Sequence, residues 1–406
     1  MGAASVAEAS LASEWVGQLE RWIQDHGLRG YDPFDAKAHG LIRRVQPYAP
    51  LRKATSLALD LFPVTIRRLL RVQPTWNAKA FALVAKGELR LYERTGNDAH
   101  LTHAFEHLTW LQENGCRQDA KLCWGYPFDV SGKNIHRPAG TPVGVVSAIA
   151  GEAFALAYQI TGEDTHRDAV RAIAEFFLQD IHRLPQADGT FCFSYTPVDH
   201  WPIHNANLHA VAHLYRTSDV TGDPSFLKEA EPALRFSLDR QREDGSWPYG
   251  ERTPDAEYEK ALLDIVDHHH TGFVLRSLAE VYALTGRREI EQALLRGFAF
   301  YQKNFFTSAG TPRITTQNTY PINIHACTEG IVCPAALANL VPDAFQLATR
   351  TLLWTRKHMA DPHTGLPYYR KYPWFTNRLL CTRWGLAWTF YALCEYLYHV
   401  EDGRPR

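Results

Sequence analysis

Three consecutive histidines, His268, His269 and His270, form the densest group of chemically active side chains in the sequence, and Asp267 precedes them directly. A neutral imidazole can take or give a proton near pH 7, so this group is a candidate general acid or base. Successive residues at the start of a helix point about 100° apart. We therefore expect at most one or two of the three rings to face a common pocket, with Asp267 orienting a neighbouring ring.

The same histidines suggest a zinc site as an alternative. His268 or His269 could bind zinc together with His325, Cys327 or Asp199. However, the chain has no paired metal spacing such as His-Glu-x-x-His. We therefore expect no metal or other cofactor.

Carboxylates offer a second chemistry. A glycosidase needs two carboxyl groups on opposite sides of a sugar. Asp129 and Asp267 form the best pair, because both end long loops. The sequence leaves open whether these two side chains face each other.

Asparagine and tyrosine precede His325 in Asn318-Thr-Tyr320, and Arg378 and Arg383 lie at the last predicted inner helix. These residue types suit a uronic acid, because Arg or Asn neutralises its carboxylate while Tyr and His exchange protons at C5. Loss of a leaving group then gives a lyase, and return of the proton on the other face gives an epimerase. Alternatively, Arg383 pairs with an acid of an outer helix and Tyr320 fills the rim.

Aromatic and polar residues also gather where several helices begin, and such a mixture suits the apolar face and hydroxyl edges of a sugar ring. Asn77 and Asn205 could equally be helix caps. The predicted substrate-binding residues are Asn77, Trp124, Tyr126, His204, Asn205, Trp247, Asn318, His325, Trp374, Arg378 and Arg383.

The elements that position these residues form a repeat. Several apolar helices end in Tyr-x-x-Thr-Gly, where the glycine suits the left-handed position after a helix. The intervals between helix starts are roughly 55–65 residues, enough for two helices and their loops. The predicted helices open at Asn77, Pro142, His204, His269, His325 and Arg378.

A second set of helices lies between these, and each has one polar face. These helices are predicted at Leu101–Asn114, His166–Leu184, Ser225–Gln241, Glu289–Phe306 and Ala344–Met359. The two sets predict an all-α fold, an (α/α)6 toroid of inner and outer helices with long aromatic loops on one face. An open solenoid that binds a partner on its concave side is the alternative.

Residues 75–406 are predicted to form the toroid. Residues 1–74 add an amphipathic helix from about Ala3 to His26 and a helical pair at Leu51–Arg71 broken at Pro63, which pack on the toroid or complete it. One structural domain overall is expected.

The composition narrows the classes of function. The net charge of −1 gives no reason to expect nucleic acid binding. Seven irregularly spaced cysteines favour a reducing compartment over a disulfide framework. No run of 18 apolar residues is present, so we expect no membrane span and a cytoplasmic location.

Taken together, the Tyr-x-x-Thr-Gly helix ends and Asp-Gly-aromatic turns over residues 75–400 resemble those of the α/α-toroid carbohydrate-active enzymes. This superfamily includes six-hairpin glycosidases, toroidal polysaccharide lyases and the D-glucuronyl C5-epimerases. Asp267–Thr271 and Gly365-Leu-Pro-Tyr-Tyr369 with Tyr372-Pro-Trp374 are similar to segments of the helical domain of the epimerases.

A second resemblance is to the Gln-Trp motif of triterpene cyclases, carried by Gln241 and Trp247. Only one good copy is present. The Asp-x-Asp-Asp acid of those cyclases is absent from the sequence, and so is the Cys-His-Gly zinc pattern of lanthionine cyclases.

The resemblance and the residues together predict an enzyme that acts on a uronate-containing polysaccharide or oligosaccharide. The predicted reaction is C5 proton abstraction, by a lyase or an epimerase. The alternatives are a glycoside hydrolase with paired carboxylates and a terpenoid-cyclase-like toroid. A non-catalytic glycan-binding or scaffold protein, working with polysaccharide-biosynthesis proteins, is the remaining alternative.

Overall fold

A closed ring of helices forms the core of the computed structural model, which describes residues 5–118, 120–131, 136–252 and 260–400. Each inner helix contacts the next one along the chain, and the last contacts the first. An open solenoid would leave its first and last helices apart, so the predicted toroid is confirmed. The inner helices are α6 (Ala78–Thr95), α8 (Gly144–Thr161), α10 (His204–Thr221), α13 (His268–Thr285), α15 (Ile324–Ala336) and α17 (Trp388–His399).

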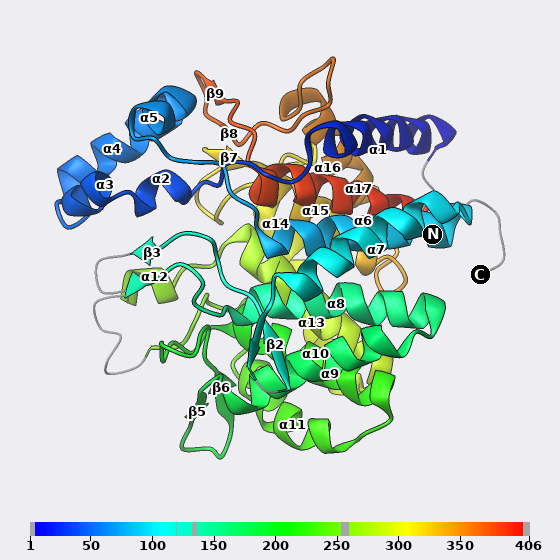
Figure 1. Cartoon of the computed structure of the whole chain (residues 1–406). Coiled ribbons are helices and arrows are strands. Elements are labelled where there is room, and N and C mark those ends of the chain that lie inside the picture. The colour runs from blue at the N-terminus through cyan, green and yellow to red at the C-terminus, as the bar shows by residue number, and fades with distance from the viewer. Residues whose placement is uncertain (1–4, 119, 132–135, 253–259, 401–406) are drawn as a thin grey trace.

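An outer layer of helices covers this ring (Figure 1). Five of them pack on the inner helix that precedes them in the chain, as the amphipathic patterns predict. Helix α1 (Val6–His26) packs on α17 and α16 and so takes the remaining outer place. The five are α7 (Asp98–Glu113), α9 (Asp164–Gln179), α11 (Ser225–Leu238), α14 (Arg288–Phe305) and α16 (Ala344–His358).

Tight turns join inner to outer helices at one end of the ring. Gly96 and Gly286 follow α6 and α13 with φ angles of 67° and 62°, the left-handed geometry that glycine adopts without steric cost. The threonine before each glycine closes the last helical turn, as when Thr95 Oγ1 donates to the Leu91 carbonyl over 2.6 Å. The Thr-Gly motif is therefore a helix stop.

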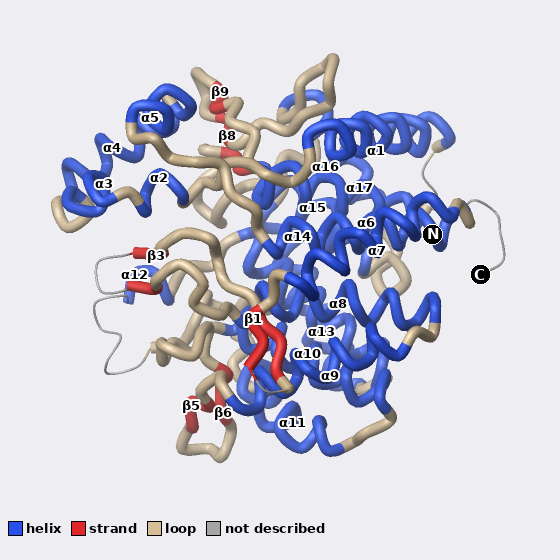
Figure 2. Tube along the Cα trace, in the orientation of Figure 1, coloured by secondary structure: helices blue, strands red, loops and turns tan. Residues whose placement is uncertain are grey.

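Long connections with short antiparallel strands occupy the other end of the ring, on the left in Figure 2. They lead from outer helices into the N-termini of inner helices, which places loop residues around one mouth. The pairs are β1 (Cys116–Gln118) with β2 (Lys121–Cys123), β3 (Val130–Ser131) with β4 (His136–Arg137) and β5 (Arg183–Pro185) with β6 (Phe191–Phe193). A three-stranded sheet holds β7 (Ile322–Asn323), β8 (Arg370–Lys371) and β9 (Thr376–Asn377), and the short helix α12 (Lys260–Leu263) lies in a further connection.

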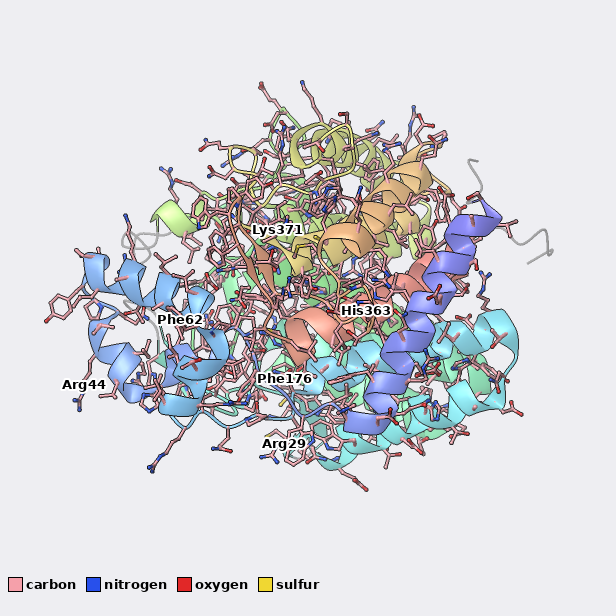
Figure 3. The ribbon with its side chains drawn as sticks, turned by 90° about the horizontal axis from the view of Figure 1, so that it is seen from above. Arg29, Arg44, Phe62, Phe176, His363 and Lys371 are labelled. Carbon is pink, nitrogen blue, oxygen red and sulfur yellow. The ribbon has the colours of Figure 1, made fainter. Side chains whose placement is uncertain are left out.

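Four further helices stand beside the mouth, between α1 and α6 in the sequence. Figure 3 shows the arm that carries Arg44 and Phe62 projecting from the ring. Its base is tied to the ring through Asp32, which bonds Arg383 from the far end of the chain. The helices of the arm are α2 (Asp35–Ala38), α3 (Gly40–Val45), α4 (Ala49–Leu61) and α5 (Pro63–Leu69).

Two predicted helix boundaries need correction. The last inner helix was expected to open at Arg378, but residues 376–377 pair with β8 as strand β9. The helix begins instead with a π-helical turn, η2 (Thr382–Ala387), which runs into α17. In addition, the outer helix expected at His166–Leu184 ends earlier, at Gln179 of α9.

Within the described residues, α8 is the one helix long and apolar enough to cross a membrane by length and composition. Because 72% of the tested span is buried inside the structure, its apolar surface serves the core of the ring.

Candidate active site

Asp267 organises the mouth at the start of α13. Its side chain caps the helix by accepting a hydrogen bond of 3.0 Å from the His270 backbone N–H. Its carboxylate also accepts from His270 Nδ1 at 2.6 Å and pairs with His269 Nδ1 at 3.2 Å. Burial works to raise the pKa of Asp267, but the two neighbouring imidazoles and the hydrogen bonds from His270 outweigh it and hold that pKa below its usual value. Asp267 is therefore an ionised carboxylate that orients two histidines.

The three consecutive histidines diverge. His268 is fully buried, with Nδ1 against Tyr301 Oη at 3.2 Å on outer helix α14, so it belongs to the wall of the ring and is no part of the mouth. The His269 ring lies 5.0 Å from the His325 ring, and the His270 ring lies 4.4 Å from Tyr249 (centroid distances). Two of the three predicted catalytic histidines therefore share the mouth.

His325 is the second imidazole of the mouth. It begins α15, where Asn323 caps the helix, and its ring lies against Trp384 and Trp388 at 4.5 and 4.8 Å. Its Nδ1 is buried without a hydrogen-bond partner among the described residues. Burial lowers the pKa of His269 to about 3 and holds the pKa of His325 well below 6.5. Both rings are therefore neutral at pH 7, and each has a nitrogen lone pair that can take a proton.

Lys79 is a site residue that the sequence analysis missed. It is the second residue of α6, with 3% of its surface exposed, and its Nζ is 5.4 and 5.2 Å from the ring centroids of Phe273 and Trp388. Burial, reinforced by the positive charges of Arg383 and Arg276, holds its pKa well below 10.5. Among the described residues, no carboxylate lies within 4.0 Å of Nζ. A lysine inside an otherwise apolar helix start, two residues after the cap Asn77, was the available signal.

Arg383, predicted to bind a substrate carboxylate, already holds one from the protein. Its Nε and Nη2 donate to the two oxygens of Asp32 at 2.7 and 3.0 Å, and both side chains are buried. The expected partner was an acid of an outer helix, but the acid comes from the segment between α1 and α2. Arg378 is exposed, with its guanidinium 5.1 Å from the ring of Tyr368. Neither arginine is therefore free in the mouth.

Tyrosines and a buried ion pair form another part of the wall. Arg137 Nη2 binds Asp199 at 2.8 Å, and its guanidinium lies 4.9 Å from the ring of Tyr195. Burial, with the nearby Tyr126 and Tyr249 next in effect, raises the pKa of Tyr195 well above 10. The ring of Tyr126, a predicted substrate-binding residue, lies 4.9 Å from the Arg383 guanidinium.

Three predicted substrate-binding residues lie instead between the two rings of helices. Trp124 and Trp247 are buried, and their Nε1 atoms donate to the carbonyls of Leu111 (3.0 Å) and Ser237 (2.7 Å) on outer helices. His204 lies between Ser237 Oγ and Glu251. The indole N–H needs a partner when buried, and these carbonyls provide it. The single Gln-Trp motif is thus a structural contact.

The remaining predicted residues are divided between the mouth and its rim. Asn205 is buried one turn before His209 on the face of α10 that points into the ring, and its Oδ1 has no partner among the described residues. Asn318 is exposed, Tyr320 is 42% exposed and Trp374 is 76% exposed. Asp129 pairs with Arg43 Nη1 at 2.9 Å.

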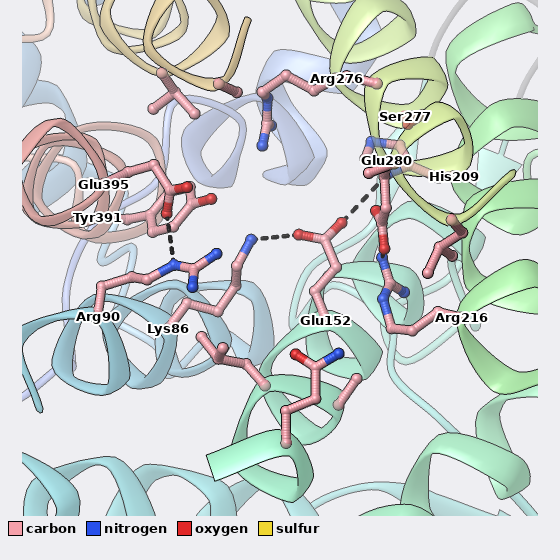
Figure 4. A pocket seen from close by; sticks show the side chains of 18 of the residues that line it. Lys86, Arg90, Glu152, His209, Arg216, Arg276, Ser277, Glu280, Tyr391 and Glu395 are labelled. Carbon is pink, nitrogen blue, oxygen red and sulfur yellow. Dashed lines mark hydrogen bonds and ion pairs between the residues drawn. The ribbon is translucent and has the colours of Figure 1, made fainter. Parts of the chain in front are cut away.

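Behind the mouth, the centre of the ring continues into a cavity of about 400 Å³ (Figure 4). Its walls come from the middle and C-terminal halves of the inner helices, so it lies toward the face opposite the mouth. Charged side chains line it in pairs. The pairs are Lys86 with Glu152, Arg216 with Glu280, and Arg90 with Glu395.

Two groups of described residues have the composition and spacing of metal ligands. One is Asp267, His269 and His270; the other is Glu20, Glu88, His100 and His103 between α1, α6 and α7. Cys327, an expected zinc ligand, is buried beside Ile322 and Met359, and Asp199 is paired with Arg137. These groups are candidates, and no cofactor is established by them.

The comparisons with known proteins agree on the fold. No protein-family model and no curated protein matches the sequence. The structure of cellobiose 2-epimerase from Bacillus thermoamylovorans B4167 aligns with a TM-score of 0.63 at 12% identity, covering 80% of this chain and 87% of the other. A D-mannose isomerase aligns at 0.59 and 15% identity (81% and 88% covered), and an unsaturated glucuronyl hydrolase specific for heparin at 0.55 and 12% identity (80% and 86% covered). The chain thus has the fold of the α/α-toroid carbohydrate-active enzymes, as the sequence resemblance predicted.

Proposed function

We propose that the chain acts on a carbohydrate by removing and returning a proton at a carbon beside a carbonyl or carboxyl group, as an epimerase or lyase does. The observation that carries the proposal is the pair of neutral imidazoles, His269 and His325, at the front end of the ring. They come from different helices, α13 and α15. Inversion at one carbon requires two proton carriers, one for each face: one neutral imidazole takes the proton, and the other, after it has taken a proton from solvent water, returns that proton to the opposite face.

Asp267 determines which nitrogen of His269 can act. The His269 Nδ1 lies 3.2 Å from Asp267 Oδ1, and we propose that this nitrogen carries the hydrogen, because an ionised carboxylate favours an N–H beside it. The lone pair is then on Nε2, which is the atom we propose as the general base. Asp267 also stabilises the imidazolium that forms when His269 takes a proton, as a carboxylate does beside a catalytic histidine.

For the substrate we propose a uronate-containing oligosaccharide or polysaccharide, with abstraction of the proton at C5. A negative charge develops on the carboxyl oxygens in that step, and a fixed cation or hydrogen-bond donor near them lowers the barrier. Tyr249 and Trp384 flank the histidines and offer ring faces to the C–H side of a sugar. Tyr320, at the rim, is the alternative to His325 as the second proton carrier, and Asn318 and Trp374 are proposed outer contacts.

Hydrolysis by paired carboxylates is supported less well, although some neighbours in fold are hydrolases. A glycosidase needs a carboxylic acid that keeps its proton until it donates it. Asp267 is instead held ionised, and Asp129 is engaged by Arg43 at 2.9 Å.

Deuterium uptake from heavy water tests the proposal. The intact protein is incubated with a panel of uronate oligosaccharides and neutral reducing sugars, and products are followed by mass spectrometry and NMR. We expect deuterium in the recovered sugar for an epimerase, or a rise in ultraviolet absorbance from a new double bond for a lyase. New reducing ends without either signal would show a hydrolase, and binding without any reaction would show a glycan-binding protein; both results contradict the proposal.

A further inference from the structure

We propose that Lys79 is the anion-binding residue of the mouth and that it holds the carboxylate of an acidic sugar. This inference rests on the proton-transfer function proposed above and identifies the protein group that selects its substrate class. The sequence had suggested Arg378 and Arg383 for this role, but the first is exposed over Tyr368 and the second is occupied by Asp32.

The pairing of charges around Lys79 singles it out. The two arginines whose charges act on it each have an acid of their own: Arg383 has Asp32 at 2.7 Å, and Arg276 has Glu329 at 2.7 Å. Lys86, further along α6, pairs with Glu152. Lys79 Nζ has no carboxylate within 4.0 Å among the described residues. A buried charge without a partner destabilises the folded state. Such a group is expected where a ligand supplies the missing charge.

The position of Lys79 relates it to the histidines. Its Nζ lies over Phe273 and Trp388, at 5.4 and 5.2 Å from the ring centroids. His325 contacts both of these rings, at 5.4 and 4.8 Å, and His269 contacts Phe273 at 6.0 Å. The amine and the two imidazoles therefore lie against the same aromatic rings, and the charge of Lys79 contributes to lowering the pKa of both imidazoles.

This arrangement accounts for an anionic substrate in particular. A carboxylate at Nζ would favour the charged form of the amine, which burial and the neighbouring arginines now disfavour. In a uronate the carboxyl group is attached to C5, so the same ammonium would stabilise the charge that develops as His269 removes the C5 proton. A neutral sugar has no carboxylate, so it would neither favour the charged form of the amine nor be stabilised by the ammonium as its proton is removed.

A purely structural cation over two aromatic rings is the competing explanation. It predicts that replacing Lys79 lowers stability and leaves the choice between charged and neutral sugars unchanged. Our proposal predicts that replacing Lys79 removes the preference for charged sugars. It also predicts little loss of stability, because the charge that is removed is buried and unpaired.

The test compares each of three uronates (glucuronate, galacturonate and mannuronate) with its neutral amide. Affinities are measured by calorimetry on the intact protein at pH 7 and low salt. For at least one uronate we expect the wild type to bind the acid about tenfold or more tightly than the amide, which corresponds to one charge-assisted contact. Lys79→Met should bring that ratio to about one, and Lys79→Arg should keep a preference for the acid. Lys303→Met, on the exposed face of α14, is the matched control and should keep the full ratio.

The proposal is overturned if the wild type binds no uronate better than its amide, or if Lys79→Met keeps the preference. Thermal unfolding of Lys79→Met, with Lys79→Gln as a second variant, shows whether a lost preference reflects lost structure. The two proposals can fail separately. Deuterium exchange into neutral sugars alone would support the proton-transfer function and contradict the role of Lys79. Binding of a uronate through Lys79 without exchange would support the role of Lys79 and contradict the proton-transfer function.

Discussion

The front of the ring's central space, at the mouth, and the rear, at the cavity, are lined by the same inner helices. They differ in whether their charged side chains have partners. On α13 one stripe at helical spacing runs through both, from His269 past Phe273 to Arg276 and Glu280. At the front, Lys79 and His325 Nδ1 have no partner among the described residues. At the rear, the charges are matched, as in Lys86 with Glu152 and Arg216 with Glu280 (Figure 4).

This difference separates groups that hold the ring together from groups that await a ligand. The rear contains the cavity of about 400 Å³, and its charged lining residues are paired. Pairing points to the front, because a buried amine without a carboxylate partner destabilises the folded state unless a ligand supplies the missing charge.

The largest expected effect is on catalysis at the front. His269→Ala removes the proposed general base, so the rate of deuterium exchange into the substrate should fall by about 10²–10⁴-fold. Its unfolding free energy should change by less than about 2 kcal/mol, as for most substitutions. His363→Ala, on an exposed loop, is the control and should leave both quantities unchanged. Full activity in His269→Ala would remove this residue from the mechanism.

The next effect is on stability at the rear. Glu152→Gln leaves Lys86 without its acid partner and should lower the free energy of unfolding by about 3–5 kcal/mol, measured with urea. Adding Lys86→Met to this variant should restore most of the loss, since the unpaired charge is then gone. Glu106→Gln, on the exposed face of α7, is the control. A loss of sugar binding without a loss of stability in Glu152→Gln would instead make the rear a binding site.

A smaller effect concerns acid pH. Burial lowers the pKa of His209, His213, His268 and His269 to about 3, whereas the unfolded chain protonates these residues below about 6.5. The unfolded state therefore binds more protons between these values, and stability should fall as the pH drops from 6.5 toward 3. Each histidine contributes up to about 1.4 kcal/mol per pH unit.

Urea unfolding at a series of pH values measures this dependence. The slope should be shallower in His269→Ala by about one histidine's share and unchanged in His363→Ala. Equal slopes in all three proteins would show that His269 takes a proton freely in the folded state.

The smallest expected effect is at the rim. Tyr320 is 42% exposed, and Tyr320→Phe should lower the exchange rate by less than about tenfold while His269→Ala lowers it far more. A loss of about a hundredfold or more would make Tyr320 the second proton carrier in place of His325.

Part of the site could be named from the sequence because its residues are neighbours in the chain. Asp267, His269 and His270 lie side by side, and His325 opens the next inner helix. Trp124, Trp247 and His204 were assigned to the mouth on residue type alone, but their partners on the outer helices draw them into the wall. Lys79 stands out in the sequence as a charge in an otherwise apolar helix start, but only the tertiary structure shows that it is buried.

The sequence by itself determined the ring. Apolar periodicity predicted the inner and outer helices, and the Thr-Gly motifs predicted where several inner helices end. Both signals are local effects of helix geometry. Only the tertiary structure decided which side chains meet. A step of about 100° per residue sends His268 into the wall and His269 into the mouth. The ring closes where α17 packs on α6, and Asp32 contacts Arg383 across 351 positions of sequence. Because Asp32 pairs with Arg383, Lys79 is left among the described residues as the cation of the front without a carboxylate partner.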